Sequence, residues 1–244
     1  EAELLAVMKH VRFAVMAEEF LRETVVAWPA LGSAEARSML LTAVLPLVGV
    51  TKPVPRWGFG ARLIYVVGGE VQGRRLSRVE LYDPQNASWT QLAGMASPRT
   101  MHCCVALEGK LYAVGGFGAD SRPTLDTAEV YDPQTDGWQP LAKMSTARCA
   151  LGLAAVGGKI YAIGGCDDDS VLESVETYDP QLGAWALVAS MSEERAHHAS
   201  VVLDGKIYVM GGLGDSTLDT VEVYDPQADS WQRVASMPQG LCDH

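Results

Sequence analysis

The chain has 244 residues, enough for one or two domains with a sizeable core. Its formal net charge of −11 argues against nucleic acid or an anionic membrane surface as a partner. The five cysteines form no CxxC pair and no even framework, which favours a reducing compartment, so we expect a cytoplasmic protein.

Residues 1–50 differ in kind from the rest and predict about three short helices. Apolar residues recur there at helical spacing, first at Leu4, Leu5, Met8 and Val11. Pro46 ends the last helix, because the residue before a proline resists the α conformation. The nearly apolar run over 39–50 is too short to cross a bilayer.

Two prolines mark residues 51–61 as a linker. The chain begins at Glu1 rather than at Met, so we expect its start to be internal to a longer parent protein. The part that follows the linker has a different character, because it repeats.

Four copies of one motif read Tyr-Asp-Pro-Gln, with a Trp seven residues after the Tyr. The tyrosines are 49, 47 and 46 residues apart. A period of roughly 50 residues carried by strand-forming segments is typical of a repeat architecture. The Tyr and Trp pairs are Tyr82 and Trp89, Tyr131 and Trp138, Tyr178 and Trp185, and Tyr224 and Trp231.

Further residues recur in register with this motif. A Gly-Gly pair precedes each Tyr, at Gly68 and Gly69, Gly115 and Gly116, Gly164 and Gly165, and Gly211 and Gly212. A Glu lies two residues before each Tyr, at Glu80, Glu129, Glu176 and Glu222. A Met follows each Trp, at Met95, Met144, Met191 and Met237, and an Arg follows three of these, at Arg99, Arg148 and Arg195.

The second copy shows how each repeat resolves into four strands. Residues 99–107 predict the first strand, and the apolar residues 110–114 predict a second strand buried on both faces. Residues 127–131 alternate and predict the third strand, which Asp132-Pro133 ends. Residues 137–142 predict the fourth strand. Short antiparallel strands repeated in this way describe a β-propeller with one four-stranded sheet per blade.

The recurring residue types have a physical reason. Trp supplies a large apolar body between stacked sheets. Gly-Gly has no Cβ where a neighbouring backbone approaches, and it reaches positive φ freely where a strand ends abruptly. We expect the recurring Arg side chains to be structural and to pair with the recurring Glu side chains.

The repeated motif resembles the kelch repeat, which has the same order of Gly-Gly, Tyr-Asp-Pro, Trp, Met and Arg. The resemblance covers residues 62–237 and implies a mainly β kelch propeller. Its blades are expected at about 62–95, 99–144, 148–191 and 195–237, with a tail at 238–244. Residues 1–50 resemble the C-terminal half of a BACK domain, which precedes the kelch repeats in kelch-like (BTB-BACK-kelch) proteins.

The end of the chain departs from the repeat. Leu241 stands where a fifth copy would have Arg. Kelch-like proteins usually have six blades, and four are visible here. The ring therefore either closes on four blades or belongs to a truncated form, and we favour truncation.

We found no constellation of catalytic or metal-ligating residues. Copper radical oxidases resemble kelch folds and need Tyr and His around a metal, but His197 and His198 are adjacent and point to opposite faces of a strand. The acidic run at 167–169 lacks the spacing of an EF-hand calcium loop. We therefore expect no enzyme, no cofactor and no metal site.

The sequence varies most in the loop after each Gly-Gly pair, while the framework repeats. Loops that vary on a shared scaffold usually lie on the face where partners bind, and the turns between blades share that face in this family. The expected partner-binding residues are Arg74, Arg75, Phe117, Arg122, Asp167, Asp168, Asp169, Glu193, His197 and Asp215.

The resemblance implies a substrate-recognition adaptor of a cullin-three RING ubiquitin ligase. The propeller loops would bind a protein substrate, and the BTB and BACK regions of the full-length parent would hold the cullin-three scaffold. The alternative is a kelch scaffold protein that binds actin or another cytoskeletal protein.

Overall fold

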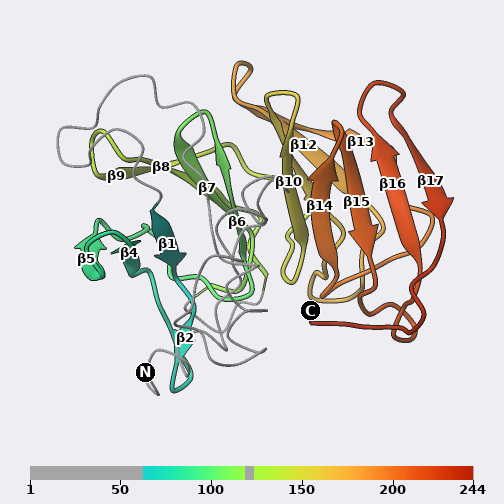
Figure 1. Ribbon diagram of the computed structural model, residues 1–244, viewed down its shortest axis with the longest axis horizontal. Helices are drawn as coiled ribbons and strands as arrows, with labels where there is room; N and C mark the ends of the chain where they lie inside the picture. Colours follow the sequence, from blue (N-terminus) through green and yellow to red (C-terminus); the bar gives the residue numbers. More distant parts are fainter. Residues whose placement is uncertain (1–62, 119–123, 244) are drawn as a thin grey trace.

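The computed structural model describes residues 63–118 and 124–243, which form seventeen strands and no helix (Figure 1). A mainly β fold is therefore confirmed for this part of the chain. The helical segment expected at 1–50 and the linker expected at 51–61 lie outside the described residues, as does Arg122.

The strands form one three-stranded sheet, three four-stranded sheets and one hairpin, all antiparallel. The first sheet contains β1 (Ile64–Val67), β4 (Val79–Asp83) and β5 (Ser88–Leu92), and the hairpin contains β2 (Glu70–Val71) and β3 (Arg74–Arg75). The second sheet contains β6 (Cys103–Leu107), β7 (Lys110–Val114), β8 (Ala128–Asp132) and β9 (Gly137–Pro140). The third contains β10 (Gly152–Val156), β11 (Lys159–Ile163), β12 (Val175–Asp179) and β13 (Ala184–Val188). The fourth contains β14 (Ala199–Leu203), β15 (Lys206–Met210), β16 (Val221–Asp225) and β17 (Ser230–Val234).

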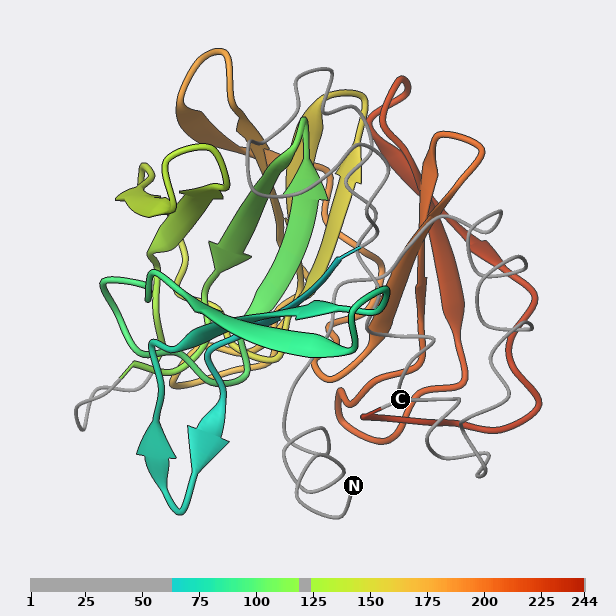
Figure 2. The same ribbon diagram turned by 60° about the vertical axis from the view of Figure 1, so that its left-hand side comes forward.

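Each four-stranded sheet is a meander whose strands pair in chain order, as expected of a propeller blade. The innermost strands β6, β10 and β14 contact one another in succession, and the sheets follow one another around the molecule (Figures 1 and 2). Among the described residues, no strand joins the fourth sheet to the first, so the sheets do not close into a ring.

The innermost strands begin later than the sequence predicted. Strand β6 starts at Cys103, whereas the first strand of this blade was expected from Arg99. Met101 has a φ of 52°, a left-handed conformation that a regular strand cannot contain. Ala150 and His197 have φ values of 51° and 56° at the same position in the next two blades.

These left-handed residues connect the blades through their backbones. The Ala150 amide donates to the Met101 carbonyl at 2.9 Å, and the His197 amide donates to the Ala150 carbonyl at 2.9 Å. The Asp243 amide continues the series to the His197 carbonyl at 3.0 Å, with a φ of 57°. One backbone hydrogen bond per blade therefore links consecutive sheets near their inner ends.

The core lies between consecutive sheets rather than within any one of them. Tyr112 and Val114 of the second sheet, for example, pack with Ile160 and Tyr178 of the third. A similar cluster of buried residues fills the space between the first and second sheets, and another the space between the third and fourth. Each blade therefore needs a neighbour to bury its apolar face.

The recurring tryptophans join blades, but they are only partly buried. Trp138 packs against Tyr131 with ring centroids 5.3 Å apart and the rings tilted, and its Nε1 donates to the Ala93 carbonyl of the first blade at 2.9 Å. Trp89 is 44% exposed. The indoles therefore act at the rim between blades, where one edge is apolar and the N–H needs a partner.

The Gly-Gly pairs lie where the next blade approaches, as the sequence predicted. Gly115 has a φ of 66°, and a Cβ there would lie 2.3 Å from the Arg148 carbonyl oxygen. Gly116 has a φ of 92° and a similar clash with the Thr100 carbonyl, at 2.6 Å. A side chain at either position would push apart backbones that the inter-blade contacts hold together.

Gly115→Ala should therefore cost about 3 kcal/mol or more of unfolding free energy, because the positive φ and the backbone clash add. Gly158→Ala is the matched control, since its φ is 76° but nothing lies within 4 Å of its Cβ position. Its cost should be about 1 kcal/mol. Urea unfolding measures both, and equal costs would show that close approach of the blades does not require glycine.

A buried histidine adds a second test of the blade interface. His102 is 4% exposed, and burial, followed by the charge of Arg99, lowers the pKa of its imidazole to about 3. In the unfolded chain the imidazole pKa is about 6.5. At a pH between these two values, the unfolded state therefore binds a proton that the folded state does not bind. The contribution of His102 to stability is therefore present above pH 6.5 and is lost as the pH falls from 6.5 toward 3.

His102→Leu should make stability less sensitive to acid, since Leu151 already occupies the equivalent position in the third blade. Between pH 7 and pH 5, the wild-type protein should lose about 2 kcal/mol more unfolding free energy than the variant. Urea unfolding at the two pH values measures the difference. Parallel losses in both proteins would mean that His102 is protonated in the folded state.

Candidate functional site

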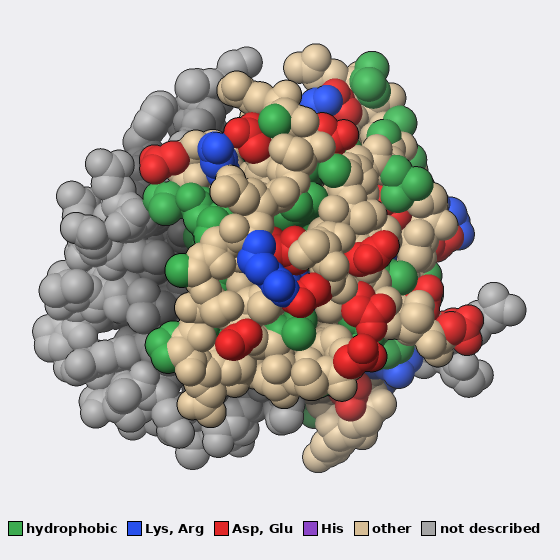
Figure 3. All heavy atoms as spheres, turned by 90° about the vertical axis from the view of Figure 1, so that its right-hand side faces the viewer, with side chains coloured by type: hydrophobic (Ala, Val, Ile, Leu, Met, Phe, Trp, Pro, Cys, Tyr) green, Lys and Arg blue, Asp and Glu red, His purple; other side chains and the backbone are tan. Residues whose placement is uncertain are grey.

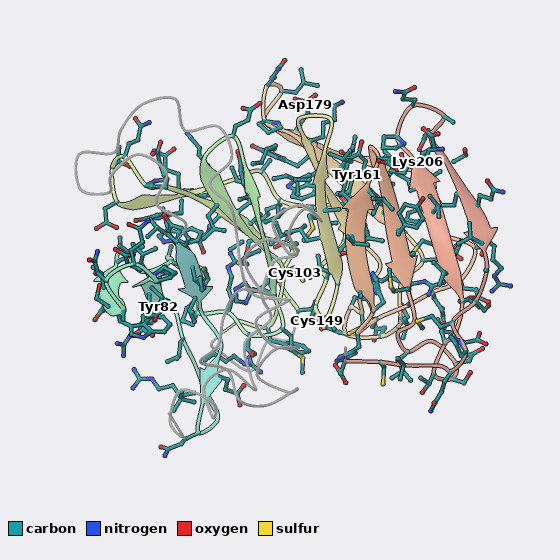
Figure 4. The ribbon with its side chains drawn as sticks, in the orientation of Figure 1. Tyr82, Cys103, Cys149, Tyr161, Asp179 and Lys206 are labelled. Carbon is teal, nitrogen blue, oxygen red and sulfur yellow. The ribbon has the colours of Figure 1, made fainter. Side chains whose placement is uncertain are left out.

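The loop after each Gly-Gly pair lies against the turn that leads into the next blade. The Gly116 amide donates to the Arg148 carbonyl at 2.7 Å, and the Gly165 amide donates to the Arg195 carbonyl at 2.9 Å. In Figure 4, Cys149, which follows Arg148, lies at the opposite end of the sheets from Asp179. The varied loops and the inter-blade turns therefore share one end of the propeller, which we call the loop face.

A buried arginine supports the loop face in each inter-blade turn. Arg99 has no exposed surface; its Nη1 donates to the Gly115 and Thr127 carbonyls at 2.9 Å, and its Nη2 donates to Glu129 Oε1 at 3.0 Å. Arg148 and Arg195 make the equivalent bonds to Glu176 at 3.1 Å and to Glu222 at 2.9 Å. The predicted pairing of the recurring Arg and Glu residues is confirmed.

The same carboxylates hold the turns themselves. Glu129 accepts the Ala96 amide at 2.7 Å and the Ser97 amide at 3.1 Å, and Glu176 accepts the Ser145 amide at 2.7 Å. Each Glu thus neutralises a buried guanidinium and satisfies backbone donors that the turn leaves without strand partners. This is why the turns between blades keep one shape while the adjoining loops differ.

Glu129→Gln should lower the unfolding free energy by about 3–5 kcal/mol, because it leaves the buried Arg99 charge without its counter-ion. Asp126→Asn is the matched control, since Asp126 pairs with Lys143 at 3.0 Å on the exposed surface. That change should cost no more than about 1 kcal/mol. If chemical denaturation finds the two costs equal, the buried pair does not hold the blades.

The last turn keeps this backbone pattern although its arginine is absent. The Leu241 carbonyl accepts the Gly212 amide at 2.7 Å, and the Leu241 amide donates to the Leu218 carbonyl at 3.1 Å. These bonds match those of Arg195 in the preceding turn, to Gly165 and Leu172. The backbone of residues 241–243 therefore makes the same hydrogen bonds as the earlier turns between blades, even though Leu241 replaces the expected Arg.

At the opposite end, a second recurring ion pair was not predicted from the sequence. Lys159 Nζ lies 3.2 Å from Asp179 Oδ2, and Lys206 Nζ lies 2.9 Å from Asp225 Oδ2. This pairing gives a reason for the Lys that follows a Gly at the start of the second strand in both blades, at Gly158-Lys159 and Gly205-Lys206. The recurring Asp of Tyr-Asp-Pro is the sequence signal that could have indicated this ion pair. Asp179 also accepts the Gln181 amide of the turn at 2.9 Å.

The first blade carries the most basic part of the loop face. Strand β3 consists of Arg74 and Arg75, and residues 72–78 line a hollow of about 670 Å³ with Gln91, Leu92, Gly94 and Pro98. The Arg74 side chain is exposed and makes no hydrogen bond or ion pair with any residue in the described ranges. Arg78 pairs with Glu80. Among the described residues, the hollow therefore offers a guanidinium without a counter-ion, in a chain of net negative charge.

Arg75 connects this hollow to the second blade. Its guanidinium lies 5.4 Å from the centroid of the Phe117 ring and donates a hydrogen bond to the Gly118 carbonyl. The arrangement is a cation–π contact between two of the expected partner-binding residues. It places a half-buried aromatic ring beside the basic hollow.

The acidic loop of the third blade contacts the second blade on its other side. Asp168 Oδ1 accepts the Thr124 hydroxyl at 2.6 Å, and Asp169 is exposed. Asp167 faces its own loop, accepting the Asp169 amide at 2.9 Å and the Ser170 amide at 2.8 Å. Burial tends to raise the pKa of Asp167, but these bonds outweigh it, and the pKa lies below its ordinary value. Asp167 is thus a turn-forming residue.

The remaining candidates belong to the fourth blade and lie apart from this group. Glu193 accepts the Thr220 hydroxyl at 2.6 Å and pairs with Arg233, whose hydrogen bond holds the Glu193 pKa below its ordinary value. His197 Nδ1 lies 2.5 Å from Asp243 Oδ1, and Asp215 is exposed in its loop. Figure 3 shows acidic side chains spread over the side on which the fourth sheet lies.

The loop face thus brings together Arg75, Phe117 and Asp168 through contacts between consecutive blades, with Thr124 between the last two. Among residues 63–118 and 124–243, no group of three or more His, Cys, Asp or Glu side chains could hold a metal ion. In the same ranges, no helix is long and apolar enough to cross a membrane.

Comparison with known proteins agrees with this geometry. The Kelch motif matches residues 59–96, 98–145, 147–192 and 194–238. The chain belongs to the kelch-repeat family. Kelch-repeat proteins bind protein partners, which fits a face of varied loops on a repeated scaffold.

Individual relatives match parts of this kelch chain. Kelch-like protein 7 of Rattus norvegicus is 46% identical over 50 residues, which are 20% of this chain and 8% of that protein. Kelch-like ECH-associated protein 1A of Danio rerio is 33% identical over 112 residues, 46% of this chain and 18% of that protein. The matches thus span less than a fifth of these relatives' own length. The solved structure of YjhT has the same fold, with a TM-score of 0.63 at 19% identity over 74% of this chain and 65% of that one.

Proposed function

We propose that this kelch chain is the substrate-recognition part of a cullin-three RING ubiquitin ligase adaptor and binds a protein through its loop face. The observation that carries the proposal is a series of contacts across three consecutive blades. Arg75 contacts Phe117, Phe117 pairs with Thr124, and Thr124 donates to Asp168. A protein segment lying across these loops would touch residues of all three blades at once.

The rigidity of the scaffold supports a binding role. The buried Arg99, Arg148 and Arg195 fix the turns, so the loops beside them start from defined positions. A preorganised surface loses less conformational entropy when a partner binds. Residues that differ among the blades can therefore set which partner is recognised.

The charge of the hollow indicates the character of the partner segment. Arg74 and Arg75 border it, and Arg74 is not neutralised by any described residue. Carboxylates or phosphates pair with a guanidinium through strong, charge-assisted hydrogen bonds. An acidic segment of the partner therefore fits the hollow, and the partly exposed Phe117 side chain would contact an apolar side chain beside it.

The cullin-three part of the proposal rests on the resemblance of the sequence to kelch-like (BTB-BACK-kelch) proteins. The cullin scaffold would bind the BTB and BACK regions of the full-length parent, and the propeller would present the substrate. Such an adaptor performs no chemistry itself, and it would act in the cytoplasm without nucleic acid or membrane.

Affinity capture with the tagged full chain tests the proposal. Arg74→Glu with Arg75→Glu should reduce recovery of the specific partner by about tenfold or more. Lys159→Glu with Lys206→Glu is the matched control, because it makes the same charge change at the opposite end of the sheets. That control should keep recovery within about twofold of wild type.

Ubiquitination of the captured partner in cells that contain the parent protein should then fall when cullin three is depleted. Equal losses with both double variants would contradict binding at the loop face. Capture of actin, together with co-sedimentation of the chain with actin filaments, would replace the adaptor proposal by the cytoskeletal alternative.

A further inference from the structure

Two cysteines meet at the base of the acidic loop of the third blade. Cys149 follows the buried Arg148, and Cys166 follows the Gly164 and Gly165 pair. No disulfide joins the two residues in the structure, and their Sγ atoms are 2.9 Å apart. A disulfide bond is about 2.05 Å long, so the sulfurs lie about 0.9 Å from bonding distance.

The repeat itself creates this proximity. An isolated antiparallel bridge joins the same two positions in three blades, as Thr100 and Phe117, Cys149 and Cys166, and Ala196 and Leu213. In the third blade, the Cys149 amide donates to the Cys166 carbonyl at 2.8 Å, and the Cys166 amide donates back at 2.9 Å. Residues paired in this way have Cα atoms about 5.5 Å apart, within the range that a disulfide spans.

The two thiols differ in access. Cys149 is 0% exposed, whereas Cys166 is partly exposed at the loop face. The hydrogen bond to Cys166 and then burial raise the pKa of the Cys149 thiol, so Cys149 keeps its proton at neutral pH. An oxidant from solution would therefore reach Cys166 first, with Cys149 already in place behind it.

We propose that Cys149 and Cys166 form a reversible redox pair that a peroxide closes to an intramolecular disulfide. Hydrogen peroxide transfers one oxygen to the Cys166 sulfur, which becomes a sulfenic acid, and the O–O bond breaks to release water. The Cys149 sulfur then attacks Cys166 Sγ; the S–S bond forms, the S–O bond breaks, and the hydroxide takes the Cys149 proton. Two thiols lose two electrons in all, and one peroxide becomes two waters.

The disulfide would act on the loop face directly. Cys166 begins the loop that carries Asp168, which contacts Thr124 of the second blade. A covalent bond to Cys149 would tie this loop to the framework turn and restrict its motion. The inference rests on the thiol geometry alone and holds whether or not the adaptor function is correct.

Peptide mapping of the full chain tests the pair. The reduced protein is treated with graded hydrogen peroxide, the remaining thiols are alkylated, and the digest is analysed without reduction. We expect a cross-linked peptide that joins Cys149 to Cys166 at peroxide concentrations that leave the buried Cys104 alkylatable after unfolding. Dithiothreitol should restore both thiols. The oxidised protein should unfold at a temperature at least about 4 °C higher.

Two variants separate the role of Cys166 from that of Cys149. Each introduces the residue that the fourth blade has at the equivalent position, Leu213 or Ala196, so that the fold should be kept. In Cys166→Leu, the buried Cys149 should stay reduced under the same treatment. In Cys149→Ala, Cys166 should stop at the sulfenic acid, which dimedone labels, or pass to the sulfinic acid. Oxidation of Cys149 in Cys166→Leu at the wild-type rate would overturn the proposed order.

Three results with the wild-type protein would overturn the pair itself. Cys166 could become sulfinic acid while Cys149 stays a thiol, both thiols could remain alkylatable, or Cys166 could cross-link chiefly to the exposed Cys242. In each case the short distance between Cys149 and Cys166 would have no redox consequence.

Discussion

The structure depends on a buried arginine between consecutive blades. Arg99, Arg148 and Arg195 are fully buried, and each pairs with a glutamate that also accepts turn amides. A guanidinium and a carboxylate taken out of water cost more than their attraction returns, unless further hydrogen bonds satisfy them. Here the carbonyls of the Gly-Gly pairs and of the residues just before the third strands accept hydrogen bonds from the arginines. The charge pair therefore fixes the geometry between blades, which apolar packing alone would leave less defined.

The loop face follows from this constraint. Since the buried Arg–Glu pairs hold the turns, the loops beside them can differ in sequence without disturbing the scaffold. The basic hollow around Arg74, the contact of Arg75 with Phe117 and the meeting of Cys149 with Cys166 all occupy equivalent parts of different repeats. Both the proposed protein binding and the proposed redox pair therefore use positions that the repeat places and that the individual blade fills with its own residues.

Much of the fold could be predicted because the same set of residues recurs four times at a constant spacing. This recurrence predicted the blades, the role of Gly115 and Gly116, and the pairing of Arg99 with Glu129. The left-handed conformation of Met101 was missed, since nothing in its residue type requires a positive φ. The Met101 carbonyl accepts the Ala150 amide of the next blade, a contact that the residue type does not reveal.

The site was harder to predict than the fold. Arg75 and Phe117 were expected to face a partner and also contact each other, whereas Asp167 and Glu193 bind their own turn or framework. A loop carboxylate can accept a nearby amide or face solvent, and composition does not distinguish these outcomes. Only a feature repeated in register, or a contact between blades, separates a structural residue from one available to a partner.

Hydrogen exchange at the turn amides tests the central claim most directly. Ser145 is exposed, yet its amide donates to the buried Glu176 at 2.7 Å, whereas the Gln181 amide donates to the less buried Asp179 at 2.9 Å. If the buried pairs hold the blades, the Ser145 amide should exchange at least about 100-fold more slowly than the Gln181 amide. Equal exchange rates at these two amides would contradict the account.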